Sequence, residues 1–101
     1  MIHGFLKACT VSPALRVADC AFNTQQTIAA MQRAALDGAQ LAVFPELGLT
    51  GYTCGDLFFQ QPLQRAAAKG LAAVLEASAG LDLVALVGLP VAVDGKLYNC
   101  A

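Results

Sequence analysis

The sequence has 101 residues, which is the size of one small domain. Hydrophobic residues make up 57% of it and charged residues only 13%, which is about half the usual charged share of a soluble domain. The net charge of −1, without a basic cluster, gives no support for binding to nucleic acid or to an anionic membrane. No apolar run approaches the roughly 18 to 20 residues that a membrane span requires.

The first two elements follow from local patterns. Residues 5–11 are apolar at all but two positions, which predicts a strand in the centre of a sheet. Asn23 is a good N-cap residue, so we expect a helix over residues 24–37, with Gly38 as its C-terminal stop. The expected core face of this helix carries Ile28, Met31, Ala35 and Leu36, at spacings of i, i+3, i+7 and i+8.

A second strand is predicted over residues 39–44, parallel to the first because a helix connects them. Pro45 has no N–H for a ladder and should end this strand. Glu46 follows at once, and no other charged residue appears before Asp56. A carboxylate at the end of a buried strand, followed by a loop with glycines, lies where α/β folds place chemistry. The alternative for Glu46 is a solvated acid without a catalytic role.

The second half of the chain predicts one helix and a hairpin. A helix is expected over residues 62–80, with a proline in its first turn and a small-residue face around Gly70 that permits close packing. Residues 83–89 form a continuous apolar run typical of a buried strand. Residues 91–101 predict a hairpin with a primed turn at Asp94-Gly95. The predicted class is therefore α/β, with the order β-α-β-α-β-β.

Four sequence segments resemble a known family. The segment FPELGLTGY at residues 44–52, followed by DLF at 56–58, is similar to the first catalytic motif of the nitrilase (carbon–nitrogen hydrolase) superfamily. GLP at 88–90 and LYNCA at 97–101 also fit this family. The longer pattern resembles, more narrowly, the glutaminase domain of glutamine-dependent NAD synthetases. This resemblance implies the N-terminal part of an α-β-β-α sandwich, with residues 1–101 as a partial, truncated domain that we expect to continue beyond Ala101.

The resemblance also implies a reaction. Family members hydrolyse an amide with a thiolate nucleophile, a lysine and a glutamate that acts as general base. Glu46 matches the general base, and Tyr52 matches a tyrosine that lines the glutamine pocket. The family's lysine and cysteine lie beyond Ala101, so we expect this chain alone to be inactive. The alternative for Tyr52 is a loop aromatic that caps the core.

The implied substrate is glutamine, and the implied partner is the synthetase domain of the same parent chain. That domain uses the released ammonia, with ATP and magnesium, to amidate nicotinic acid adenine dinucleotide to NAD. No cofactor is expected within the 101 residues themselves. Exposed sheet edges predict association, and we therefore expect a homo-oligomer. The alternatives are part of a stand-alone amidase of the same family, or a non-catalytic interaction fragment.

The cysteines and the single histidine do not predict a metal site. The cysteines are Cys9, Cys20, Cys54 and Cys100, and none forms a C-x-x-C pair. Lys7, Pro13 and Arg16 interrupt the N-terminus, which makes it a poor export signal. We therefore expect free thiols and a cytoplasmic protein. Cys54 is expected to be an exposed loop thiol, and the resemblance gives it no catalytic role.

Overall fold

The computed structural model describes residues 4–101 and has the expected α/β class, with one strand more after the second long helix than the expected order β-α-β-α-β-β. The strands are β1 (Ala8–Thr10), β2 (Leu41–Val43), β3 (Val84–Leu86), β4 (Leu89–Val93) and β5 (Lys96–Cys100). The helices are α1 (Cys20–Leu36), the short 3₁₀ helix η1 (Gly55–Phe59) and α2 (Gln61–Ser78). Within the described residues, no helix is apolar over a sufficient length to cross a bilayer.

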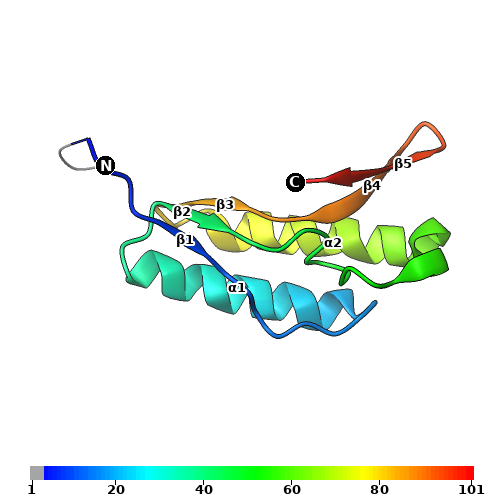
Figure 1. The fold of residues 1–101 in the computed structure, drawn as a ribbon, viewed down its shortest axis with the longest axis horizontal. Coiled ribbons are helices and arrows are strands. Elements are labelled where there is room, and N and C mark those ends of the chain that lie inside the picture. Colours follow the sequence, from blue (N-terminus) through cyan, green and yellow to red (C-terminus); the bar gives the residue numbers. More distant parts are fainter. Residues whose placement is uncertain (1–3) are drawn as a thin grey trace.

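The first three strands form one parallel sheet in the order β1-β2-β3 (Figure 1). The predicted parallel pairing of the first two strands is confirmed. The predicted central place of the first strand is wrong for this sheet, because β3 pairs with the free side of β2. The central strand is therefore β2. The residues that directly follow β2 lie between those that follow β1 and those that follow β3.

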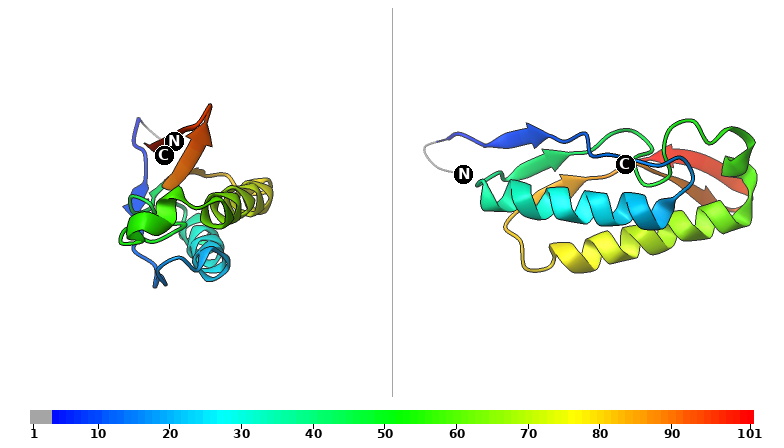
Figure 2. Two further views of the ribbon diagram at one scale, coloured as in Figure 1. Left: turned by 90° about the vertical axis from the view of Figure 1, so that its right-hand side faces the viewer. Right: turned by 90° about the horizontal axis from the view of Figure 1, so that it is seen from below.

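The two faces of this sheet are unequal. Cys9, Ala42 and Ala85 are paired across the three strands and point into the core. Both long helices lie on this side of the sheet (Figures 1 and 2). The residues before and after Cys9, Ala42 and Ala85 in each strand point to the opposite face of the sheet. Of these, Val84 and Leu86 are 60% and 44% exposed. The second face therefore presents apolar side chains to solvent.

Helix α1 begins about one turn before its predicted start. Asp19 caps it, since its carboxylate accepts a hydrogen bond from the backbone N–H of Phe22 at 3.1 Å. The predicted N-cap, Asn23, instead lies inside the helix and is fully buried. Its side chain exchanges hydrogen bonds of 2.7 and 2.8 Å with the backbone of Arg16. Asp19 and Asn23 are both favourable N-cap residues. Because the Asn23 side chain is bonded to Arg16, it is Asp19 that caps the helix.

The helices meet along small side chains. A Cβ added at Gly70 of α2 would lie 2.4 Å from Oγ1 of Thr24 on α1, so the predicted close approach at Gly70 is confirmed. Met31 is fully buried as expected, whereas Leu36, expected in the core, is 87% exposed in the last turn of α1. The buried face of α1 consists of Cys20, Asn23, Thr24, Thr27, Ala30, Met31 and Ala34.

The predicted hairpin is confirmed and is longer than expected. Strands β4 and β5 pair antiparallel around Asp94 and Gly95, whose φ angles of 51° and 76° suit a primed turn. The predicted strand over residues 83–89 is divided into β3 and the start of β4. The division falls at Gly88, whose carbonyl accepts a hydrogen bond from the Leu49 N–H at 3.1 Å. The chain thus leaves the parallel sheet where it contacts the loop after β2.

Candidate active site

Glu46 lies just beyond the carboxyl end of the central strand β2. The N–H of Phe44 still donates to the carbonyl of Leu86 at 2.9 Å, which continues the ladder by one residue. Pro45 has no N–H to donate, and the pairing ends there as predicted. The chain then turns, because the N–H of Gly48 donates to the carbonyl of Pro45 at 3.1 Å. The end of β2 and the turn that follows it therefore determine the position of Glu46.

The turn that carries Glu46 is fixed by a close backbone contact. Leu47 has a φ of 53°, a left-handed conformation that costs a non-glycine residue free energy. A Cβ on Gly88 would lie 2.5 Å from the Leu47 nitrogen and 2.8 Å from the Pro45 carbonyl oxygen. Only glycine allows the β3–β4 junction to lie this close. The strained turn is thus held in place by the neighbouring chain.

The loop that follows is anchored by buried hydrogen bonds. Thr50 is fully buried, and its hydroxyl lies within hydrogen-bond distance of the carbonyl oxygens of Leu47 and Gly51, at 3.2 and 2.9 Å, so its one proton can be donated to either of them. Its own carbonyl accepts from the Ala18 N–H at 2.7 Å. Asn23 of α1 donates its side-chain amide to the Leu49 carbonyl at 3.2 Å. The loop after Glu46 is therefore a rigid support and not a free connection.

Among residues 4–101, the Glu46 carboxylate has one side-chain hydrogen-bond partner. Nδ2 of Asn99, on β5, donates to Oε1 of Glu46 at 2.5 Å. Both side chains border a cavity of about 370 Å³ at the end of the parallel sheet. Its lining residues are Val43, Phe44, Pro45, Glu46, Leu86, Val87, Gly88, Asn99, Cys100 and Ala101. An exposed carboxylate in a largely apolar hollow can exchange a proton with a bound molecule, which is the work of a general base.

Tyr52 is not part of this cavity. Its side chain is 64% exposed, on the far part of the loop, and it is absent from the residues that line the hollow around Glu46. The structure therefore does not bring the two site residues of the sequence prediction together in one cavity. The role of Tyr52 in substrate binding stays a prediction.

The cysteines differ from expectation at one position. Cys54, predicted to be exposed, is only 6% exposed, and its thiol contacts the carbonyl oxygens of Thr50 and Gly51, at 3.2 and 3.4 Å. It is part of the loop's support because the loop folds back over it. Burial raises the pKa of the Cys20 thiol, and the neighbouring Cys54 and Asp19 raise it further. All four cysteines are free.

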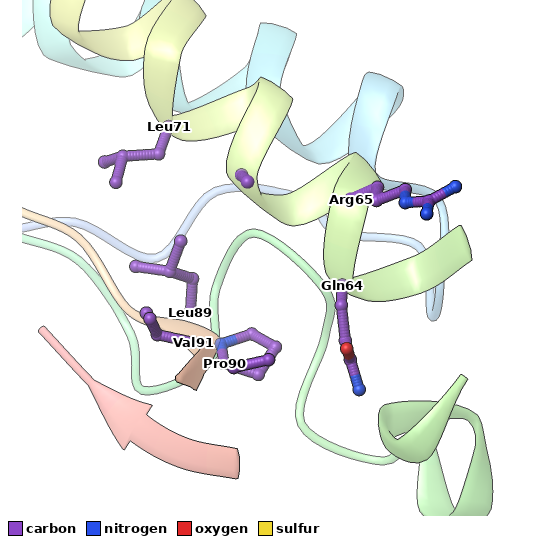
Figure 3. A pocket seen from close by; sticks show the side chains of 8 residues that line it. Gln64, Arg65, Leu71, Leu89, Pro90 and Val91 are labelled. Carbon is purple, nitrogen blue, oxygen red and sulfur yellow. The ribbon is translucent and has the colours of Figure 1, made fainter. Parts of the chain in front are cut away.

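A second hollow lies between α2 and β4 (Figure 3). It has a volume of about 310 Å³, and Leu71, Leu89 and Val91 give it an apolar floor beside Gln64 and Arg65 of α2. In the part of the chain that the structure describes, no acid, thiol or histidine lines it. This hollow therefore offers shape but no group that can take up a proton, unlike the cavity at Glu46.

Two contributors to the site were missed by reasoning from the sequence. Gly88 and Asn99 lie within the GLP and LYNCA segments, which supported the resemblance without being given a role. A glycine beside a proline at the end of an apolar run is the signal for Gly88. For Asn99, the only signal in the sequence was its place in the predicted hairpin. That place does not predict a contact with Glu46, which is 53 positions away in the chain.

Residues 7–101 match the family model described as Carbon-nitrogen hydrolase. This match spans nearly the whole chain, and the chain therefore belongs to the carbon-nitrogen hydrolase family. The family predicted from the FPELGLTGY segment is confirmed.

The similar proteins are more specific. The chain is 34% identical over 99 residues to the glutamine-dependent NAD(+) synthetase of Mycobacterium tuberculosis, and 33% identical over 78 residues to that of Rattus norvegicus. These alignments cover 98% and 77% of the chain but only 15% and 11% of the relatives. The narrower resemblance, to glutamine-dependent NAD synthetases, is therefore confirmed. The chain spans about a seventh of the length of the mycobacterial protein.

Solved structures agree on the fold. The glutamine-dependent NAD+ synthetase from Acinetobacter baumannii, in complex with adenosine diphosphate, matches 87% of the chain with a TM-score of 0.75 and 30% identity. That of Cytophaga hutchinsonii matches 94% with a TM-score of 0.86 and 24% identity. An amidase from Nesterenkonia sp. matches 84% with a TM-score of 0.67 and 24% identity. The chain covers 16%, 16% and 32% of these chains.

Proposed function

We propose that this chain is the N-terminal part of the glutaminase domain of a glutamine-dependent NAD synthetase, and that Glu46 is its general base. The observation that carries the proposal is the position of Glu46, which lies beyond the central strand, beside a cavity and in hydrogen-bond contact with Asn99. Similarity to NAD synthetases over 98% of the chain supports the choice of glutamine as the amide.

In this proposal Glu46 accepts the proton of a thiol nucleophile and later that of the water which cleaves the thioester. The thiol, and a lysine that stabilises the oxyanion, come from parts of the whole protein outside this chain. Tyr52 would contact glutamine from the loop after Glu46, and its exposed ring leaves it free to do so. The 101 residues alone should therefore hydrolyse no glutamine.

The remaining partners of the whole protein are assigned on the same basis. Among residues 4–101, no group of three or more His, Cys, Asp and Glu side chains could hold a metal ion. We assign ATP and magnesium to the synthetase domain of the whole protein, which takes the ammonia and forms NAD, because the similar proteins are glutamine-dependent NAD synthetases. The exposed apolar face and the free edges of the parallel sheet support burial against other parts of the protein and a homo-oligomer. Free thiols support a cytoplasmic location.

The test uses the whole protein that contains this chain, with NAD formation driven either by glutamine or by an added ammonium salt. Glu46→Gln should lower the glutamine-driven rate by about 10²- to 10⁴-fold, the usual contribution of a general base. The ammonium-driven rate should persist, because it bypasses the glutaminase site. Glu76→Gln makes the same chemical change at an exposed position on α2 and is the matched control.

Equal glutamine-driven rates for the two variants would contradict the role of Glu46. A wild-type protein that releases no ammonia from glutamine would contradict the function itself. The isolated 101-residue chain supplies a further check. Ammonia release by this chain, lost in Glu46→Gln, would show that the nucleophile lies within it and would contradict the assignment of the thiol to another part of the protein.

A further inference from the structure

The contact between Asn99 and Glu46 depends on the hairpin. Strand β4 begins at Leu89, directly after Gly88 has contacted the turn that carries Glu46. Strand β5 returns along β4 with Asn99 opposite Pro90, which lies next to that junction. The hairpin thus carries a polar side chain back to the carboxylate, at 2.5 Å. The fold brings together two residues that neither share an element nor follow one another.

We propose that Asn99 is a positioning residue for the general base, which rests on the proposed function of Glu46. Its Nδ2 holds Oε1 of Glu46, and this leaves Oε2 to exchange the proton with the thiol and with water. A carboxylate held by one oxygen loses rotational freedom about its last bonds, so it meets the nucleophile in one orientation. Asn99 touches neither substrate nor nucleophile in this role and acts only through Glu46.

An asparagine suits this task better than a charged donor. An amide N–H donates a hydrogen bond without bringing a positive charge, so it orients the carboxylate while leaving it able to accept a proton. The position is also set by register, because a shift of one residue would turn the Asn99 side chain to the other face of the hairpin. The Asp94-Gly95 turn fixes that register.

The test compares variants of the whole protein. Asn99→Leu keeps the size of the side chain and removes the donor, and kcat for glutamine-driven NAD formation should fall about 10- to 100-fold. KM for glutamine should change less than about twofold, because substrate contacts are intact. Asn99→Gln keeps an amide and should recover part of the rate. Lys96→Gln, on the same strand, is the control and should match the wild type.

Two further measurements separate positioning from a structural role. Ammonium-driven NAD formation should be unchanged in Asn99→Leu. In a Glu46→Gln background, Asn99→Leu should lower the rate no further, since the group that it positions is already absent. The proposal would be overturned by equal kcat in Asn99→Leu and Lys96→Gln, by no recovery in Asn99→Gln, or by a parallel loss of the ammonium-driven rate.

A readout that needs no activity keeps this inference distinct from the proposed function. In the NMR spectrum of the whole protein with isotope-labelled asparagine and glutamine, the Asn99 side-chain amide signals should shift in Glu46→Gln. The Gln64 amide, which donates to the Phe58 carbonyl at 2.9 Å, is the internal control and should not shift. An unchanged Asn99 signal would overturn the contact even if glutamine hydrolysis is found. A shifted signal in a protein without glutaminase activity would contradict the function alone.

Discussion

Gly88 and Leu47 approach so closely that a Cβ at position 88 would lie 2.5 Å from the Leu47 backbone nitrogen. This contact joins the β3–β4 junction to the left-handed turn that carries Glu46. It also places the first residue of β4, and with it the hairpin that carries Asn99, beside the same turn. One glycine thus sets the distance between the carboxylate and its amide partner.

Gly88→Ala should destabilise the protein because the added methyl group meets backbone atoms that cannot rotate away. Overpacking of this kind typically costs about 1–3 kcal/mol in the free energy of unfolding. Urea denaturation measures the change. Gly80→Ala is the control, since a Cβ at that position meets nothing within 4 Å. It should change the free energy of unfolding by less than about 0.5 kcal/mol. Equal stability of the two variants would show that the junction moves apart freely.

Asn23→Ala should be more damaging than its place on a helix indicates. The buried amide hydrogen-bonds the backbone of Arg16 and the carbonyl of Leu49, so its removal leaves the buried Leu49 carbonyl and the partly buried backbone groups of Arg16 without this partner. An unsatisfied buried group costs about 1–3 kcal/mol. The exposed neighbour Gln25→Ala should change the free energy of unfolding by less than about 0.5 kcal/mol. A thermal or urea unfolding series of both variants tests the difference.

The elements that sequence patterns predict well here are those with local causes. Pro45 ends a strand because of its own chemistry, and Asp94-Gly95 closes a hairpin because its backbone favours positive φ. The helix start was misplaced for a non-local reason. Asn23 has the chemistry of a cap, but its amide is used by the loop near Leu49, 26 positions along the chain.

The site was predictable only in part, for the same reason. The position of Glu46 after an apolar strand marked it, and the family resemblance gave it a role. Its partner Asn99 could not be found from local pattern, because the contact depends on a glycine at the junction and on hairpin register together. The burial of Cys54 was missed likewise, since a loop that folds over its own residue shows no hydrophobic period.

The raised pKa of the Cys20 thiol predicts a pH dependence of stability. Burial is its largest cause, so the folded protein holds the thiol proton to higher pH than the unfolded chain does. The unfolded chain then binds fewer protons above the ordinary thiol value of 9.0, and the free energy of unfolding falls as pH rises. Below that value the contribution is fully present.

Urea unfolding from about pH 8 to about pH 10 measures this fall. Cys20→Ala should have a lower free energy of unfolding at every pH, because it leaves a small cavity. Its decline with pH should nevertheless be shallower than that of the wild type. Parallel declines in both proteins would assign the pH dependence to other groups.

The uncovered face of the parallel sheet predicts how stability depends on the rest of the protein. Leu86 is 44% exposed in this chain, and if the domain is the α-β-β-α sandwich of its family, that side chain is buried in the whole protein. Leu86→Ala should then cost about 2–5 kcal/mol there, as buried leucine truncations do, and clearly less in the 101-residue chain. Amide hydrogen exchange of β3 measures both values in the same units.

Leu36→Ala, at a site that is 87% exposed, is the control and should have little effect in either protein. An equal cost of Leu86→Ala in both proteins would mean that this face stays uncovered, and it would contradict the proposed sandwich.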